Sequence, residues 1–214
     1  MGEAYIIDAV RTPVGRRGGG LANEHPADLG AHAIKGLVDR TGIDPMGVDD
    51  VIMGCLDNVG PQAGDIARTA WLAAGMPEAI PGVTIDRPCG SGQQAVSFGA
   101  MGVMAGVQDM VVAGGMQNMS LIPITSAMNV MDHETIGHPE IEDPYSTSKG
   151  WVDRYGTQEI SQFRGAELIC KKWGFGREDL ERFALESHER AARAQDEGRF
   201  DNEILPYGEV TQDE

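Results

Sequence analysis

The stretch Thr84-Ile-Asp-Arg-Pro-Cys89-Gly-Ser-Gly-Gln-Gln-Ala-Val-Ser97 decides how the chain is organised around its candidate functional residue. The apolar run Gly82–Ile85 predicts a strand, and the small residues after Cys89 predict a helix that continues to about Val107. Cys89 would then lie at a strand-to-helix turn, where the N–H groups of a helix N-terminus stabilise a thiolate and bind anions. The glycines beside it would let a substrate carbonyl approach the backbone. Cys89 is therefore a candidate nucleophile; the alternative is a small buried core cysteine.

Residues 1–120 alternate between apolar, β-branched runs and helical patterns, which predicts α/β layering. The runs lack polar alternation, as in Ile6-Ile7 and Val111-Val112, and this is typical of parallel strands covered on both faces. The expected strands are Tyr5–Val10, Asp50–Met53, Gly82–Ile85 and Met110–Ala113. The expected helices are Pro26–Arg40, Gly64–Ala74 and the helix that follows Cys89.

The pattern changes near residue 120. Residues 121–150 are rich in proline and small polar residues and predict a loop. Two amphipathic helices are expected after it, over Gln158–Trp173 and Arg177–Glu197, the second with acidic residues in its first turn and Gly198 at its end. We therefore expect an α/β domain over residues 1–120 and a mainly helical, lid-like domain, incomplete in this chain, over residues 121–214.

Composition narrows the functional classes. The formal charge of −16 argues against a general nucleic-acid surface, and no apolar run reaches the roughly 18 residues of a membrane-spanning helix. Three cysteines in 214 residues, without paired spacing, argue against a disulfide scaffold and fit a reducing compartment. No signal peptide is evident, so a cytoplasmic location is expected. The five histidines share no metal-ligand spacing, and no metal site is expected.

Several motifs occur in a fixed order along nearly the whole chain. Their segments are Arg11-Thr-Pro-Val-Gly15, Val51-Ile-Met-Gly54 with Gln62 and Ala67-Arg68, Arg87-Pro-Cys89-Gly-Ser-Gly92, Ala113-Gly-Gly-Met-Gln-Asn-Met-Ser120, Arg177-Glu-Asp, Phe183-Ala-Leu-Glu-Ser-His188 and Gly198-Arg-Phe-Asp-Asn-Glu-Ile-Leu-Pro206. Each is weak alone, but together they resemble the thiolase family. The resemblance implies a thiolase-type layered α/β half with a mainly helical loop (lid) domain. It departs from the family pattern at Gln117, where glutamate is usual.

The resemblance also implies a function. It is that of an acyl-CoA C-acyltransferase, which cleaves 3-ketoacyl-CoA by thiolysis or condenses acyl-CoA, with Cys89 carrying the acyl group. Coenzyme A thioesters would be the substrates, no separate cofactor is implied, and a homodimer or homotetramer is expected. The activating histidine and second cysteine of the family are not found at a matching place, so the sequence resembles the N-terminal half of a thiolase, either a fragment or a truncated product. On its own, this half should be incomplete for catalysis.

Two alternatives remain open. A β-ketoacyl carrier-protein synthase shares the fold and a nucleophilic cysteine, although the Arg-Thr-Pro opening and the lid helices favour a thiolase. A thiolase-like protein that binds acyl-CoA or lipid without catalysis is the other alternative. The missing half and Gln117 support it, and the intact turn at Cys89 opposes it.

Other residues could be mistaken for the missing catalytic groups or could contact substrate. Short-chain thiolases often carry His-Met-Gly where this sequence has Arg154-Tyr155-Gly156, so Arg154 and Tyr155 are candidate substrate-binding residues; ordinary exposed lid residues are the alternative. Gly137-His138-Pro139 copies the tripeptide of the activating histidine, but its place in a loop favours a turn. Cys55 and Cys170 are expected to be small core residues.

Overall fold

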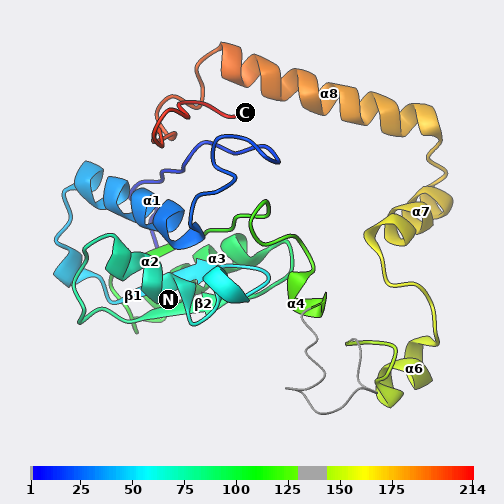
Figure 1. Cartoon of the computed structure of the whole chain (residues 1–214), viewed down its shortest axis with the longest axis horizontal. Helices are drawn as coiled ribbons and strands as arrows, with labels where there is room; N and C mark the ends of the chain where they lie inside the picture. Colours follow the sequence, from blue (N-terminus) through cyan, green and yellow to red (C-terminus); the bar gives the residue numbers. More distant parts are fainter. Residues whose placement is uncertain (1, 130–143) are drawn as a thin grey trace. The chain divides into compact units, whose positions relative to one another are not determined.

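The computed structural model describes residues 2–129 and 144–214, and the chain divides into two units (Figure 1). The first unit consists of Met1–Asn129 together with Asn202–Glu214, and the second consists of Val130–Asp201. The structure thus differs from the boundary expected at residue 120 in two ways. The first unit extends further, and the last thirteen residues of the chain return to it.

Arg11 makes several of the contacts that join the end of the chain to the first unit. Its guanidinium donates from Nη1 and Nη2 to the two carboxylate oxygens of Asp213, over 2.5 and 2.9 Å, and from Nε to Glu203 over 2.7 Å. Its backbone carbonyl accepts from Leu205 N at 2.8 Å, beside a parallel bridge to Ile204. Paired charge-assisted hydrogen bonds of this kind fix geometry strongly. Local sequence patterns do not reveal this long-range pairing.

The sheet of the first unit contains three parallel strands among the described residues: β1 (Asp50–Gly54), β2 (Gly82–Ile85) and β3 (Val111–Gly115). β1 is central, in the order β2-β1-β3. Its last residue, Gly54, stands opposite Ile85 on one side and Gly115 on the other. The carboxyl ends of all three strands therefore lie at one edge, where open α/β sheets bind ligands.

Three helices cover this sheet: α1 (Pro26–Thr41), α2 (Ile66–Ala73) and α3 (Ser91–Met104). α2 contacts β1 and β2 and packs against α1, whereas α3 contacts β1 and β3. α1 begins at a His25 cap whose side chain accepts from Ala27 N, and it ends at Gly42, with φ at 66°. Short 3₁₀ turns, η1 (Pro45–Gly47) and η2 (Gly60–Gln62), lie in the loops. The predicted α/β class is confirmed.

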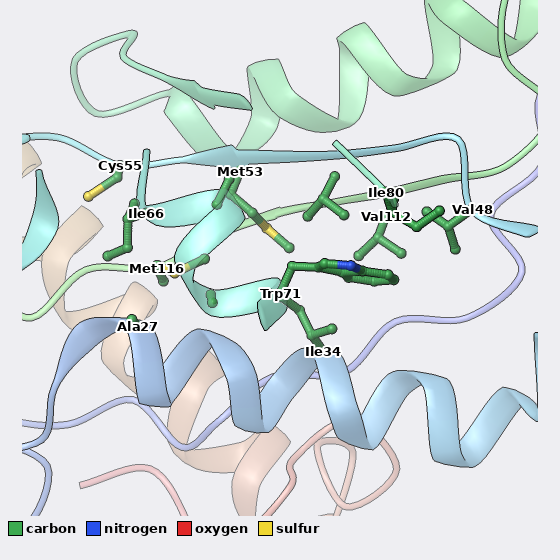
Figure 2. Close-up of a cluster of buried hydrophobic side chains, with 13 residues drawn as sticks. Ala27, Ile34, Val48, Met53, Cys55, Ile66, Trp71, Ile80, Val112 and Met116 are labelled. Carbon is green, nitrogen blue, oxygen red and sulfur yellow. The ribbon is translucent and has the colours of Figure 1, made fainter. Parts of the chain in front are cut away.

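The hydrophobic core lies between the sheet and α1, around Trp71 of α2 (Figure 2). Trp71 is fully buried and donates from Nε1 to the Pro77 carbonyl over 2.8 Å. Val51 and Met53 belong to this cluster, whereas Ile52 between them is buried outside it. Alternate residues of a strand face opposite sides of the sheet, so β1 is buried on both faces, as its uninterrupted apolar sequence indicated.

The strand predicted over Tyr5–Val10 is wrong. The structure contains no strand there, and Tyr5, Ile6 and Ile7 are exposed. A β-branched composition favours a strand only where a neighbouring strand supplies hydrogen bonds and packing. In this segment, bridge pairing starts only at Arg11.

The second unit is helical in its described part, with α6 (Lys149–Tyr155), α7 (Gln162–Trp173) and α8 (Arg177–Asp196) (Figure 1). α7 and α8 confirm the two predicted helices within a few residues. A further short helix in the first unit, α4 (Ser126–Asn129), and α6 were not expected. Ser148 and Ser161 cap α6 and α7 by accepting backbone N–H groups. No helix of the described residues has the length and apolarity needed to cross a membrane.

Candidate active site

Cys89 lies in the turn between β2 and α3 and is exposed. Ser91, which is buried, closes this turn through its hydroxyl, which accepts from Arg87 N at 3.0 Å and donates to Arg87 O over 2.9 Å. Gly90 N also donates to Arg87 O, over 2.8 Å. These bonds hold the ends of the turn together and leave Cys89 between them. The predicted placement of the cysteine at a strand-to-helix turn is confirmed.

The backbone of Cys89 adopts a positive φ of 63°. This left-handed conformation is uncommon for residues other than glycine and costs on the order of 1–3 kcal/mol. Such conformations cluster at active sites, where the surrounding structure holds a reactive side chain in place. Nothing in a cysteine side chain favours this backbone, so the sequence did not reveal it.

The first turn of α3 rests directly on the ends of two strands because glycines leave room for it. A methyl group at Gly54 would lie 2.2 Å from the Ser91 carbonyl carbon, and one at Gly115 would lie 3.4 Å from Gly92 Cα. Any side chain at Gly54 would therefore push the helix off β1. The first N–H groups of a helix have no partner within it, so those after Gly90 are suited to stabilise an oxyanion formed beside Cys89.

The other two cysteines lie in different surroundings. Cys55 is buried immediately after β1, and burial, followed by the charges of Asp86 and Asp57, raises the pKa of its thiol to about 11. Cys170 is half-buried on α7, in the second unit. Cys55 is thus a core residue, as expected, and is poorly suited to nucleophilic attack near neutral pH.

Arg154 and Tyr155, the candidate substrate-binding residues, lie at the end of α6 and are exposed. The Arg154 guanidinium carbon lies 5.2 Å from the centre of the Tyr155 ring, and this ring lies 4.6 Å from that of Trp151. The three side chains form one aromatic and cationic group within the second unit. His138 lies outside the described residues.

Two polar residues that the sequence did not single out as a pair link the loops after β1 and β3. Gln62 is fully buried, and its Oε1 accepts from Asn118 N at 3.1 Å. Next to Asn118, the side-chain nitrogen of Gln117 is buried and has no hydrogen-bond partner within the described part of the chain. Among residues 2–129 and 144–214, no group of three or more His, Cys, Asp or Glu side chains is arranged to hold a metal ion.

Comparison with known proteins decides the family. The family model for the thiolase N-terminal domain matches residues 4–214. The chain belongs to the thiolase family. Among curated thiolases, it is 62% identical to the steroid 3-ketoacyl-CoA thiolase FadA6 of Mycobacterium tuberculosis over 205 residues, which cover 96% of this chain and 49% of the relative. It is 36% identical to the beta-ketoadipyl-CoA thiolase of Escherichia coli, covering 96% of this chain and 52% of that one.

A solved thiolase structure agrees with the fold. The crystal structure of the Bacillus anthracis acetyl-CoA acetyltransferase superposes with a TM-score of 0.71 at 32% identity, over 94% of this chain and 49% of that one. The chain therefore spans about half the length of the relatives it matches. This agrees with the resemblance of the sequence to the N-terminal half of a thiolase.

Proposed function

We propose that this thiolase chain supplies the acyl-carrying half of an acyl-CoA C-acyltransferase, with Cys89 as the nucleophile. The observation that carries the proposal is the exposed thiol held with positive φ between β2 and the first turn of α3. The relatives named above support it, because their names describe thiolases and an acetyltransferase acting on coenzyme A thioesters.

The first half of the reaction follows from these residues. The Cys89 thiolate attacks the carbonyl carbon of an acyl thioester, and the N–H groups of the α3 first turn stabilise the oxyanion that forms. The carbon–sulfur bond to coenzyme A then breaks, and coenzyme A leaves as a thiolate. One thioester replaces another, so the exchange is nearly balanced in energy. In the cleavage direction, the Cys89 thiolate attacks the 3-keto carbonyl carbon of a 3-ketoacyl-CoA and forms the new carbon–sulfur bond. The carbon–carbon bond then breaks, the acyl group stays on Cys89, and the carbanion of the departing coenzyme A thioester takes up a proton.

That carbanion requires an acid–base group, and the resemblance assigns this role to a second cysteine and an activating histidine. Neither is found at a matching place in residues 1–214. General acid–base groups contribute about 10²–10⁴-fold to rate. We therefore propose that this chain by itself forms the acyl-enzyme without useful turnover.

The acyl group transferred is proposed to be bulkier than acetyl. The relative that is 62% identical carries a name that describes a steroid 3-ketoacyl-CoA thiolase. Arg154 and Tyr155 replace the His-Met pair common in short-chain thiolases, and both are exposed on α6. We propose that Arg154 and Tyr155 bind substrate, with Arg154 contacting a coenzyme A phosphate, since a guanidinium binds phosphate bidentately. The charge of −16 supports small-molecule rather than nucleic-acid partners, and the thiol chemistry supports a reducing, cytoplasmic location.

Cysteine reactivity tests the nucleophile directly. At limiting iodoacetamide, Cys89 is expected to be alkylated first, because it is exposed whereas Cys55 is buried with a pKa of about 11. Mapping the modified peptide by mass spectrometry gives the order, and earlier labelling of Cys55 or Cys170 would contradict the assignment. Incubation with acyl-CoA should leave a covalent acyl group on Cys89. Protection of Cys89 without acylation would instead support a protein that binds acyl-CoA without catalysis.

Self-association is also expected. Beyond Ser91, Ala95 and Gly99, no residue of α3 is buried, and the following apolar side chains of this segment are exposed: Val96, Phe98, Met101, Met104 and Val107. Apolar patches above a few hundred Å² seldom remain uncovered in monomers. We propose a homodimer or homotetramer. Sedimentation velocity should show a species larger than 22.9 kDa, and a folded monomer at high concentration would disprove the assembly.

A further inference from the structure

One serine hydroxyl closes the turn that carries Cys89. Ser91 Oγ accepts a hydrogen bond from Arg87 N at 3.0 Å and donates one to Arg87 O over 2.9 Å, so a single oxygen binds both backbone groups of a residue four positions earlier. A hydroxyl can do this because one atom supplies both a donor and an acceptor. Ser91 is 8% exposed, whereas Arg87 and Cys89 are exposed. The buried serine therefore ties together the two ends of an exposed turn.

Both ends of this turn are anchored to the central strand, β1. Before the turn, the carbonyl of Ile85 in β2 accepts from Cys55 N at 3.1 Å. After the turn, Ser91 rests on Gly54, where a methyl group would lie 2.2 Å from the Ser91 carbonyl carbon and 2.6 Å from its Cβ. The contact of Ser91 with Arg87 closes the chain between these two anchors.

The closed turn holds Cys89 in an unusual backbone conformation. Its φ of 63° lies in the left-handed region, which residues other than glycine seldom adopt. Such a conformation persists only where the surrounding contacts fix it. Gly90 N also donates to Arg87 O, but the Ser91 hydroxyl is the sole partner of Arg87 N within the described part of the chain. Removal of the hydroxyl therefore frees one end of the turn.

We propose that Ser91 is a positioning residue, which orients the Cys89 thiol for acyl transfer by holding the turn closed. This inference rests on the proposed function, because orientation matters when the thiol attacks a thioester carbonyl. That attack requires the sulfur, the carbonyl carbon and the N–H groups of α3 in one geometry, and small misplacements cost large factors in rate. Alkylation by iodoacetamide forms no oxyanion and requires only an accessible thiolate. Comparison of the two reactions therefore separates orientation from accessibility.

Ser91→Ala should slow acylation of Cys89 far more than alkylation. The substitution removes the hydroxyl and keeps the Cβ that rests on Gly54. One hydrogen bond changes an equilibrium by a factor of roughly 2–13, and two change it by roughly 5–150. The maximal acylation rate should therefore fall about tenfold or more. The acyl-CoA concentration for half-maximal acylation and the alkylation rate should change less than about threefold.

Ser97→Ala is a matched control in the same helix. Ser97 Oγ donates to Gln93 O over 3.0 Å, also across four positions, but Ser97 is exposed and lies further along α3. The same hydroxyl is lost away from the turn, so acylation and alkylation should both stay within about twofold of the unsubstituted protein. In both variants, the β1 amides should stay protected from hydrogen exchange, which reports a folded first unit.

NMR spectroscopy measures the turn directly. The Cα and Cβ chemical shifts of Cys89 depend on φ, so they should change in Ser91→Ala and stay the same in Ser97→Ala. Hydrogen exchange of the Arg87 amide should rise about tenfold in Ser91→Ala, because its acceptor is lost.

The outcomes separate the two proposals. Equal losses of acylation and alkylation in Ser91→Ala would overturn the positioning role, because the reactivity of the thiol in general would then have fallen. Unchanged acylation, or unchanged Cys89 shifts, would overturn it as well and leave Ser91 with a structural role alone. Absence of covalent acylation in the unsubstituted protein would overturn the proposed function instead, and the Cys89 shifts would still show whether Ser91 holds the turn.

Discussion

Cys89→Ala should abolish acyl-enzyme formation. The substitution removes the only group in the β2–α3 turn that we propose to attack the thioester, while the Ser91 and Gly90 bonds to Arg87 that shape the turn remain. Loss of an enzymic nucleophile costs on the order of 10⁴–10⁶-fold in rate. Release of coenzyme A thiol from acyl-CoA, followed together with the intact mass of the protein, measures this step.

Cys170→Ala is the control for this loss. This substitution also removes one thiol, but from α7 in the second unit. It should leave the acylation rate within about twofold of the unsubstituted protein. If acylation survived in Cys89→Ala and disappeared in Cys170→Ala, the nucleophile would be Cys170, and our assignment of Cys89 would be wrong. In Cys89→Ala, the alanine bears the same backbone strain at φ 63° as the cysteine does, so the stability of the folded protein should be nearly unchanged.

Trp71→Ala should destabilise the first unit by about 3–5 kcal/mol, the usual cost of removing a large aromatic side chain from a core. Trp71 is fully buried at the centre of the cluster between the sheet and α1, and the substitution also leaves the Pro77 carbonyl without the indole donor (Figure 2). Native-state hydrogen exchange of the β1 amides measures the free energy of opening of this core.

Trp173→Ala tests whether burial causes that effect. Trp173 is 58% exposed on α7, so its removal should change the opening free energy of β1 by no more than about 0.5 kcal/mol. Equal losses for the two substitutions would show that Trp71 does not organise the core as described.

Local sequence patterns were sufficient for most of the fold. β2 has the predicted bounds, Gly82–Ile85, and α1 extends one residue past its predicted end. Local signals mark such elements in the sequence. α1 has Pro26 at its first position and Gly42 after its last turn, and β1 has an uninterrupted run of apolar residues. The same signals placed Cys89 between a strand and a helix.

Long-range features could not be read from local patterns. The positive φ of Cys89 is imposed by the Ser91–Arg87 contacts, and no propensity of cysteine indicates it. The Gln62–Asn118 contact joins residues 56 positions apart, and neither residue type is specific for such a role. The strand predicted over Tyr5–Val10 was wrong because a local signal was present without a long-range partner. Its composition favours a strand, but the structure places no neighbouring strand beside it.

The contact between Arg11 and Asp213 has a consequence for synthesis of the chain. The two residues are 202 positions apart, and translation at about 5–20 residues per second separates their appearance by roughly 10–40 s. The ribosome completes the three strands and the helices around Trp71 within that interval. Throughout it, Arg11 has no Asp213 to bind. The contact between Arg11 and Asp213 therefore forms only after α6, α7 and α8 have been synthesised, whereas the bonds of Arg40 to Asp8 and Ala9 can form much earlier. Co-translational folding of this thiolase chain would thus proceed from its core, and the contacts of Arg11 and Val14 with Asp213 would form at the end.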